Sequence, residues 1–147
     1  MKCLSVREPW ATLIIRGIKQ IELRPWRTRY CGVLCIHASL RLSQELLDPR
    51  CGVLEREVLE IAGEEYPKTR GRIVGIVVVK GCRPSTPGDY QDALCTPSAK
   101  DFSLLLESPV TLANPVLHKG RLGVHSLPDE VRRSVAVQIS ERVPSVP

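Results

Sequence analysis

The spacing of hydrophobic positions changes several times along this chain of 147 residues, and each change predicts an element. Residues 10–16 are expected to form two helical turns, because Pro9 suits the first helical position and Gly17 can end the helix in a left-handed conformation. From Lys19 to Arg24 apolar and polar residues alternate, which is typical of a strand. One face of that strand is entirely polar.

The remaining pattern predicts further short strands and few helices. In chain order these are a strand over 32–39, an acidic amphipathic helix from 43 to about 63, a buried strand over 72–80, a short helix within 89–100, strands over 102–106 and 116–127, and a last helix over 129–140. A regular alternation of strand and helix is missing, so the fold class is α+β, a small mixed β-barrel with helices packed outside it. Residues 143–147 are expected to fray.

Length and composition fit one compact domain over residues 1–147, since 43% of the residues are hydrophobic. The longest apolar run, residues 73–79, is too short to cross a bilayer, and the first residues lack the apolar stretch of a secretory signal. We therefore expect no membrane contact and a cytoplasmic location, or a nuclear one in a eukaryotic host.

The six cysteines form no Cys-x-x-Cys pair and are interpreted as free, mostly buried thiols. Cys31 and Cys35 lie near His37, but tetrahedral zinc needs four ligands, and no second pair follows at ligand spacing. The sequence therefore predicts neither a metal site nor a cofactor.

The net charge of +5 is unevenly distributed. Residues 7–29 hold six arginines and lysines against two glutamates, whereas residues 44–65 hold seven acidic residues against two arginines. The first segment is expected to attract a polyanion such as RNA, and the second offers a possible site for a protein partner.

An ordered set of motifs occupies the first quarter of the chain. These are Leu4-Ser5-Val6, Pro9-Trp10-Ala11, the spaced residues Gly17, Lys19, Glu22 and Arg24, and a strand with Gly32, Leu34 and Ile36 to Ser39. They resemble the signature of the ASCH (activating signal cointegrator homology) family, and a weaker resemblance reaches about residue 127. The resemblance implies a PUA-like β-barrel with a cleft beside the first helix, and binding of RNA or nucleobase-like ligands.

Some members of that family resemble or act as small hydrolases, among them ribonucleases and an acetylcytidine amidohydrolase. This chain departs from the family pattern at Glu8, where glutamine is common, and at His125, where tryptophan is common. Glu22 stands where the amidohydrolases are thought to carry a threonine, so the hydroxyl nucleophile is missing there. The resemblance therefore does not extend to acyl-enzyme chemistry.

The residue types themselves suit a nucleotide. Arginine presents a planar fork to a phosphate or base edge, a carboxylate accepts from an exocyclic amine, and tryptophan offers a surface for base stacking. The predicted binding residues are Arg7, Trp10, Lys19, Glu22, Arg24, Trp26, Arg27, Arg29, His37 and Ser39, with Lys19 and Glu22 also as catalytic candidates. Equally, Glu22 and Arg24 could form an ordinary salt bridge, Trp10 could cap the core, and His37 could be a structural histidine.

Three functions remain open at this point. The first is a binding module for RNA or a modified nucleobase, and the second is a small metal-independent hydrolase in the same cleft, of the ribonuclease type. The third is a protein-interaction domain that uses the acidic segment 44–65. Glycine-rich phosphate loops, Gly-x-Ser-x-Gly elbows and His-Glu-x-x-His helices do not occur in the sequence, so the corresponding nucleotidase, esterase and zincin mechanisms lack their parts.

Overall fold

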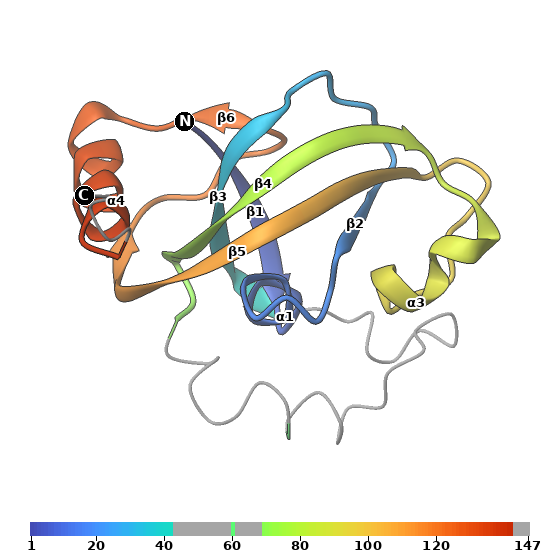
Figure 1. Ribbon diagram of the computed structural model, residues 1–147, viewed down its shortest axis with the longest axis horizontal. Helices are drawn as coiled ribbons and strands as arrows, with labels where there is room; N and C mark the ends of the chain where they lie inside the picture. The colour runs from blue at the N-terminus through green and yellow to red at the C-terminus, as the bar shows by residue number, and fades with distance from the viewer. Residues whose placement is uncertain (43–59, 61–68, 143–147) are drawn as a thin grey trace, which may run out of the picture.

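The computed structural model describes residues 1–42, 60 and 69–142 of the chain (Figure 1). Its elements, in order, are β1 (Lys2–Glu8), α1 (Trp10–Ile15), β2 (Ile21–Arg24), β3 (Gly32–Leu42), β4 (Arg72–Pro84), the 3-10 turn η3 (Pro87–Asp89), α3 (Tyr90–Ala93), β5 (Phe102–Leu117), β6 (His125–Ser126) and α4 (Asp129–Ser140). The predicted α+β class is confirmed.

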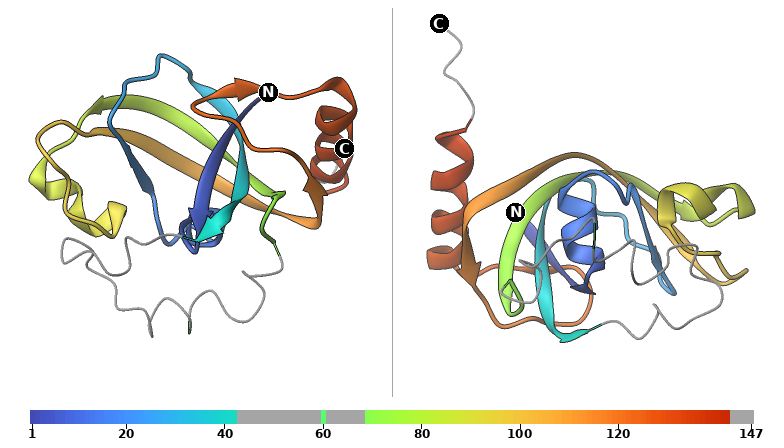
Figure 2. Two further views of the ribbon diagram at one scale, coloured as in Figure 1. Left: turned by 180° about the vertical axis from the view of Figure 1, so that it is seen from behind. Right: turned by 90° about the horizontal axis from the view of Figure 1, so that it is seen from below.

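The six strands form one mixed sheet in the order β2-β5-β4-β3-β1-β6. Strands β1 and β3 are parallel, and the other neighbours are antiparallel. The sheet curls strongly but does not close into the expected barrel (Figures 1 and 2). Across the remaining gap, Nη2 of Arg24 in β2 donates a hydrogen bond of 2.9 Å to the backbone carbonyl of Ser5 in β1. A side chain thus bridges the opening where a closed barrel would have a backbone ladder.

Helix α1 lies inside the curl of the sheet, as the right-hand view of Figure 2 shows. All six of its residues are buried, and five of them belong to the main core cluster with side chains of β1, β3, β4 and β5. The sequence Trp10–Ile15 has no polar face, so the helix is stable only when surrounded. The sequence predicted helices outside the sheet. This holds for α4, which packs against β5 through Val135 and Ile139, but not for α1.

The strand pattern differs from the prediction after residue 102. Strand β5 is continuous for 16 residues, where two separate strands were expected, and β6 contains only two residues. Ser108 and Pro109 suggest a break, but they form a bulge in which two residues of β5 face only Val77 of β4. Ser108 has a positive φ of 51°, which increases the local bend without ending the strand.

Two expectations lie outside the described residues. Of the acidic helix predicted from 43 to about 63, only Glu60 is among the described residues, and the tail 143–147 lies outside them. Within the described ranges, no helix has the length and apolar character needed to cross a bilayer.

Candidate functional site

A cleft of about 880 Å³ opens at the gap between β1 and β2. Its lining comes from β1, α1, β2, β3, the segment after α3 and the loop between β5 and β6. The polar and charged residues that line it are Ser5, Arg7, Lys19, Glu22, Arg24, His37, Ser39, Thr96, Asp101, His118, Lys119 and Arg121. The open sheet edge and the inner helix thus create the cleft that a closed barrel would not leave.

Glu22 lies at the centre of a chain of charges on one wall of the cleft. Its Oε1 is 3.7 Å from Nζ of Lys19, and its Oε2 is 3.2 Å from Nη2 of Arg24. Only 4% of Lys19 and 7% of Glu22 are exposed, whereas 24% of the Arg24 side chain is accessible. One carboxylate therefore lies between two cations, and the wall keeps a net positive charge that Arg24 presents to the cleft.

Local chain geometry places Lys19 at this point. Gly17, with a φ of +75°, ends α1, and the backbone N–H of Lys19 then donates to the carbonyl of Leu13 at 3.1 Å. The ammonium group of Lys19 donates to the carbonyl of Ala93 and lies 5.2 Å from the ring centroid of Trp10. Lys19 is thus held from several sides, and its ammonium is occupied by groups of the protein.

The rim of the cleft is strongly basic. Arg7 at the end of β1 and Lys119 and Arg121 in the loop after β5 are exposed and line the opening. With Lys19 and Arg24 of the wall, the described residues of the cleft lining include five positive side chains and only two carboxylates, those of Glu22 and Asp101. Such an excess of one sign in a concave surface attracts an anionic ligand.

The two tryptophans take different positions. Trp10 is 3% exposed and belongs to the core cluster. The Lys19 ammonium lies over its ring, and Trp10 also contributes to the cleft lining. Trp26 is half-buried against the core, with the Arg24 guanidinium carbon 5.9 Å from its ring centroid, and does not line the cleft. Base stacking on Trp10 would require Lys19 to move away.

Ser5 and His37 form a hydrogen-bonded pair in the cleft. His37 Nε2 lies 2.7 Å from the His118 carbonyl, which can only accept, so this nitrogen carries the proton. His37 Nδ1 is 3.1 Å from the Ser5 hydroxyl. Burial lowers the pKa of His37, so the ring is neutral and Nδ1 accepts from Ser5. The backbone of Gly120 covers the pair, because a Cβ there would come within 2.8 Å of the Ser5 oxygen and of a His37 ring carbon.

Seven of the ten predicted binding residues line the cleft, namely Arg7, Trp10, Lys19, Glu22, Arg24, His37 and Ser39. Trp26, Arg27 and Arg29 are not part of the lining. The predicted binding residues did not include Ser5, which belongs to the Leu4-Ser5-Val6 motif, nor His118, Lys119 and Arg121. Ser5 could have been found from strand periodicity, because it shares a face with Arg7, but the loop residues come from a distant part of the chain.

Glu8 has a structural role beside the cleft. It is fully buried, and its carboxylate accepts from the backbone N–H of Thr12 at 3.1 Å and from the hydroxyls of Thr12 and Thr69, both at 2.9 Å. Burial raises the pKa of this carboxyl, and the three hydrogen bonds partly oppose the effect. Glu8 thus satisfies a free N–H in the first turn of α1 and connects it to the segment before β4.

The fold and this cleft define a PUA-like α+β domain. The chain belongs to the ASCH domain family, whose sequence model matches residues 4–111. Among solved structures, the chain resembles ASCH from Zymomonas mobilis with a TM-score of 0.60 and 12% identity, covering 92% of this chain and 93% of that one. A point mutant of the Zymomonas mobilis protein gives a TM-score of 0.57 at 10% identity, with coverage of 92% and 96%. These likenesses concern the fold.

Two curated relatives match the chain over a short stretch. Activating signal cointegrator 1 of Homo sapiens is 51% identical over 39 residues, which are 26% of this chain and 7% of the human protein. The Mus musculus protein is 51% identical over 37 residues, 25% of this chain and 6% of its own length. The chain therefore shares a short region with these much longer proteins.

Proposed function

We propose that this ASCH domain binds single-stranded RNA, or a nucleotide with a modified base, in the cleft between β1 and β2. The observation that carries the proposal is the cationic cleft itself, with a basic rim around a buried, charge-paired Glu22. RNA binding is also consistent with the family to which the chain belongs.

In this proposal the rim and the wall have separate tasks. Arg7, Lys119 and Arg121 are exposed and bind phosphates with little regard to sequence. Arg24 and Glu22 lie deeper and present a donor fork and a carboxylate, which recognise the edge of one base. The position of Lys19 over Trp10 favours edge recognition over stacking.

The contribution of Arg24 is tested by titrating a labelled single-stranded RNA and following its fluorescence anisotropy. Arg24→Ala should weaken binding about 10- to 100-fold, the usual effect of losing hydrogen bonds to a charged group. Arg133→Ala on α4 removes the same charge from an exposed residue outside the cleft lining and should leave binding nearly unchanged. Equal losses in both folded variants would contradict binding in the cleft.

A metal-independent hydrolase in the same cleft is the second candidate. It is favoured by one observation: Lys19 and Glu22, an ammonium and a carboxylate, lie 3.7 Å apart in a largely buried wall. In a ribonuclease of this kind, Glu22 would take the proton of the RNA 2′-hydroxyl, and the 2′-oxygen would attack the neighbouring phosphorus to form a 2′,3′-cyclic phosphate. The bond from phosphorus to the 5′-oxygen would break, with Lys19 giving that oxygen a proton and Arg24 stabilising the charge on the phosphate.

Glu22→Gln separates the two candidates. If the domain is a ribonuclease, the variant should keep RNA affinity but lose turnover by about 100-fold or more, as expected for a missing general base. If it is a binding module, wild type should cleave nothing above background, and Glu22→Gln should alter base preference. Thermal denaturation of the variant shows whether the fold survives loss of the ion pairs. If neither Glu22→Gln nor Arg24→Ala affects RNA, the protein-interaction hypothesis for residues 44–65 moves to first place.

A further inference from the structure

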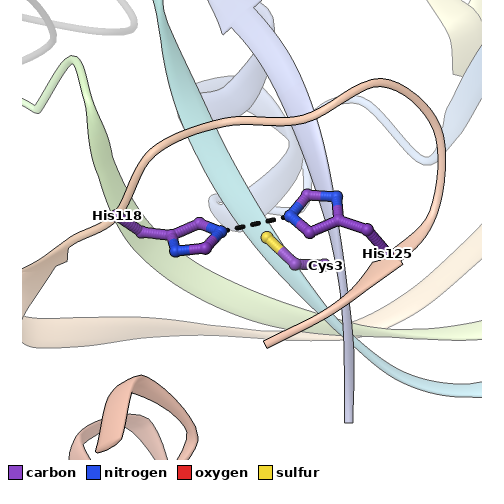
Figure 3. A group of neighbouring side chains, drawn as sticks. All are labelled: Cys3, His118 and His125. Carbon is purple, nitrogen blue, oxygen red and sulfur yellow. Dashed lines mark hydrogen bonds between the residues drawn. The ribbon is translucent and has the colours of Figure 1, made fainter. Parts of the chain in front are cut away.

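A second cluster of reactive side chains lies at the side of the cleft. The chain has three histidines, and two of them, His118 and His125, lie beside Cys3 (Figure 3). The Cys3 sulfur and a ring nitrogen of each histidine are all within 4.8 Å of one another. The sequence gives no signal for this group, because Cys3 is more than a hundred residues away from the two histidines.

Three elements of the sheet hold the cluster in place. Cys3 in β1 lies directly opposite His125 in the antiparallel pairing with β6, so both side chains project from the same face. His118 follows the last residue of β5. Figure 3 shows the two rings and the sulfur pointing toward a common space. The pairing of β1 with β6 and the start of the loop after β5 thus bring the three ligand groups together.

Hydrogen bonds orient the two rings. His125 Nδ1 lies 3.2 Å from the carbonyl of Gly123, which can only accept, so His125 carries its proton on Nδ1 and has a lone pair on Nε2. That Nε2 is 3.1 Å from Nε2 of His118, and the rings are stacked at 17°. Histidines that bind metals commonly donate their other ring N–H to a carbonyl in this way.

The separations suit a metal ion. With bond lengths of about 2.0–2.1 Å to nitrogen and about 2.3 Å to sulfur, a tetrahedral zinc ion holds its ligand atoms roughly 3.3–3.6 Å apart. The nitrogen atoms at 3.1 Å already have nearly this spacing, and the sulfur lies within 4.8 Å of both, so it would move closer when a metal binds.

We propose that Cys3, His118 and His125 form a three-ligand site for Zn²⁺ or a similar thiophilic divalent cation. Thiolate and imidazole are the ligands that zinc prefers, and three protein ligands leave a fourth position for water. His118 also lines the cleft, so the proposed metal site lies beside it. When the metal binds, the Cys3 thiol loses its proton to solvent and the thiolate binds the metal. His118 shifts its ring proton from Nε2 to Nδ1, which frees Nε2 to bind the metal.

The test is a titration of the full chain with Co²⁺, which reports a thiolate ligand by a charge-transfer band in the near ultraviolet. Wild type should bind one equivalent and show this band, and Zn²⁺ should displace the cobalt. Cys3→Ser should abolish the band. Cys35→Ser is the matched control, because Cys35 is equally buried and is the register partner of Cys3 on β3. The control should retain the band.

His125→Gln guards against a folding defect in the buried Cys3→Ser variant, since His125 is only half-buried in a two-residue edge strand. It should lower metal affinity at least about tenfold while circular dichroism stays unchanged. Absence of the band in wild type, persistence of the band in Cys3→Ser, or unchanged affinity in His125→Gln would overturn the proposal. All measurements use metal alone, so they are independent of whether the cleft binds RNA.

Discussion

Salt dependence offers a quantitative test of the basic rim. Three exposed cations of the rim are available to phosphates, namely Arg7, Lys119 and Arg121, whereas the deeper Arg24 and Lys19 are already engaged by Glu22 and by backbone carbonyls. Each contact to single-stranded RNA contributes about −0.7 to the slope of log affinity against log salt, so wild type should show a slope of about −2.1.

The double substitution Lys119→Ala/Arg121→Ala should reduce this slope to about −0.7. Between about 50 and 200 mM salt, affinity should then fall about threefold in the variant, compared with roughly 18-fold in wild type. Both residues are exposed, so the substitutions remove charge without opening the core. The assay is fluorescence anisotropy of a short labelled RNA at several salt concentrations.

Two other double substitutions make the result specific. Arg132→Ala/Arg133→Ala on α4 removes two exposed charges outside the cleft lining and should preserve the slope. Arg27→Ala/Arg29→Ala tests the sequence-based prediction that these two arginines bind RNA, although their loop is not part of that lining. If the α4 variant lowers the slope as much as the rim variant, or the rim variant leaves it unchanged, attraction is diffuse and the phosphate-binding rim is refuted.

Two further predictions concern stability and pH, and both are checked by urea denaturation across pH. The pKa of buried Glu8 is raised, so its ionised form lowers the stability of the fold at neutral pH. Glu8→Gln should therefore stabilise the fold at neutral pH. This gain should vanish below about pH 4.3, the usual pKa of a glutamate, where the carboxyl is protonated in both states. Asp89 accepts two hydrogen bonds of 2.8 Å from Arg83, which hold its pKa far below the usual range. Asp89→Asn should therefore lower the free energy of unfolding by about 2 kcal/mol at neutral pH, and the difference should shrink as pH falls below about 3.9. A pH-independent effect of either variant would contradict the assigned cause.

Local sequence was enough to predict one wall of the cleft. The alternation from Lys19 to Arg24 placed Glu22 and Arg24 on one strand face, and the structure shows them paired at 3.2 Å. The bounds of α1 and α4 were also predicted to within one residue. These features depend on period, proline and glycine, which act over a few residues and can be read without knowing the fold.

The remaining features of the cleft depend on the pairing of strands that are far apart in the sequence. Whether the sheet closes depends on how its edge strands meet, and the register of β6 against β1 brings His125 opposite Cys3. The loop with Lys119 and Arg121 follows the long strand β5, which continues through its bulge and ends beside the cleft. The sequence by itself determined helices α1 and α4 and the charged strand face. Only the tertiary structure decided the basic rim and the Cys3 cluster, because residues far apart in the chain become neighbours through strand register, which local patterns do not specify.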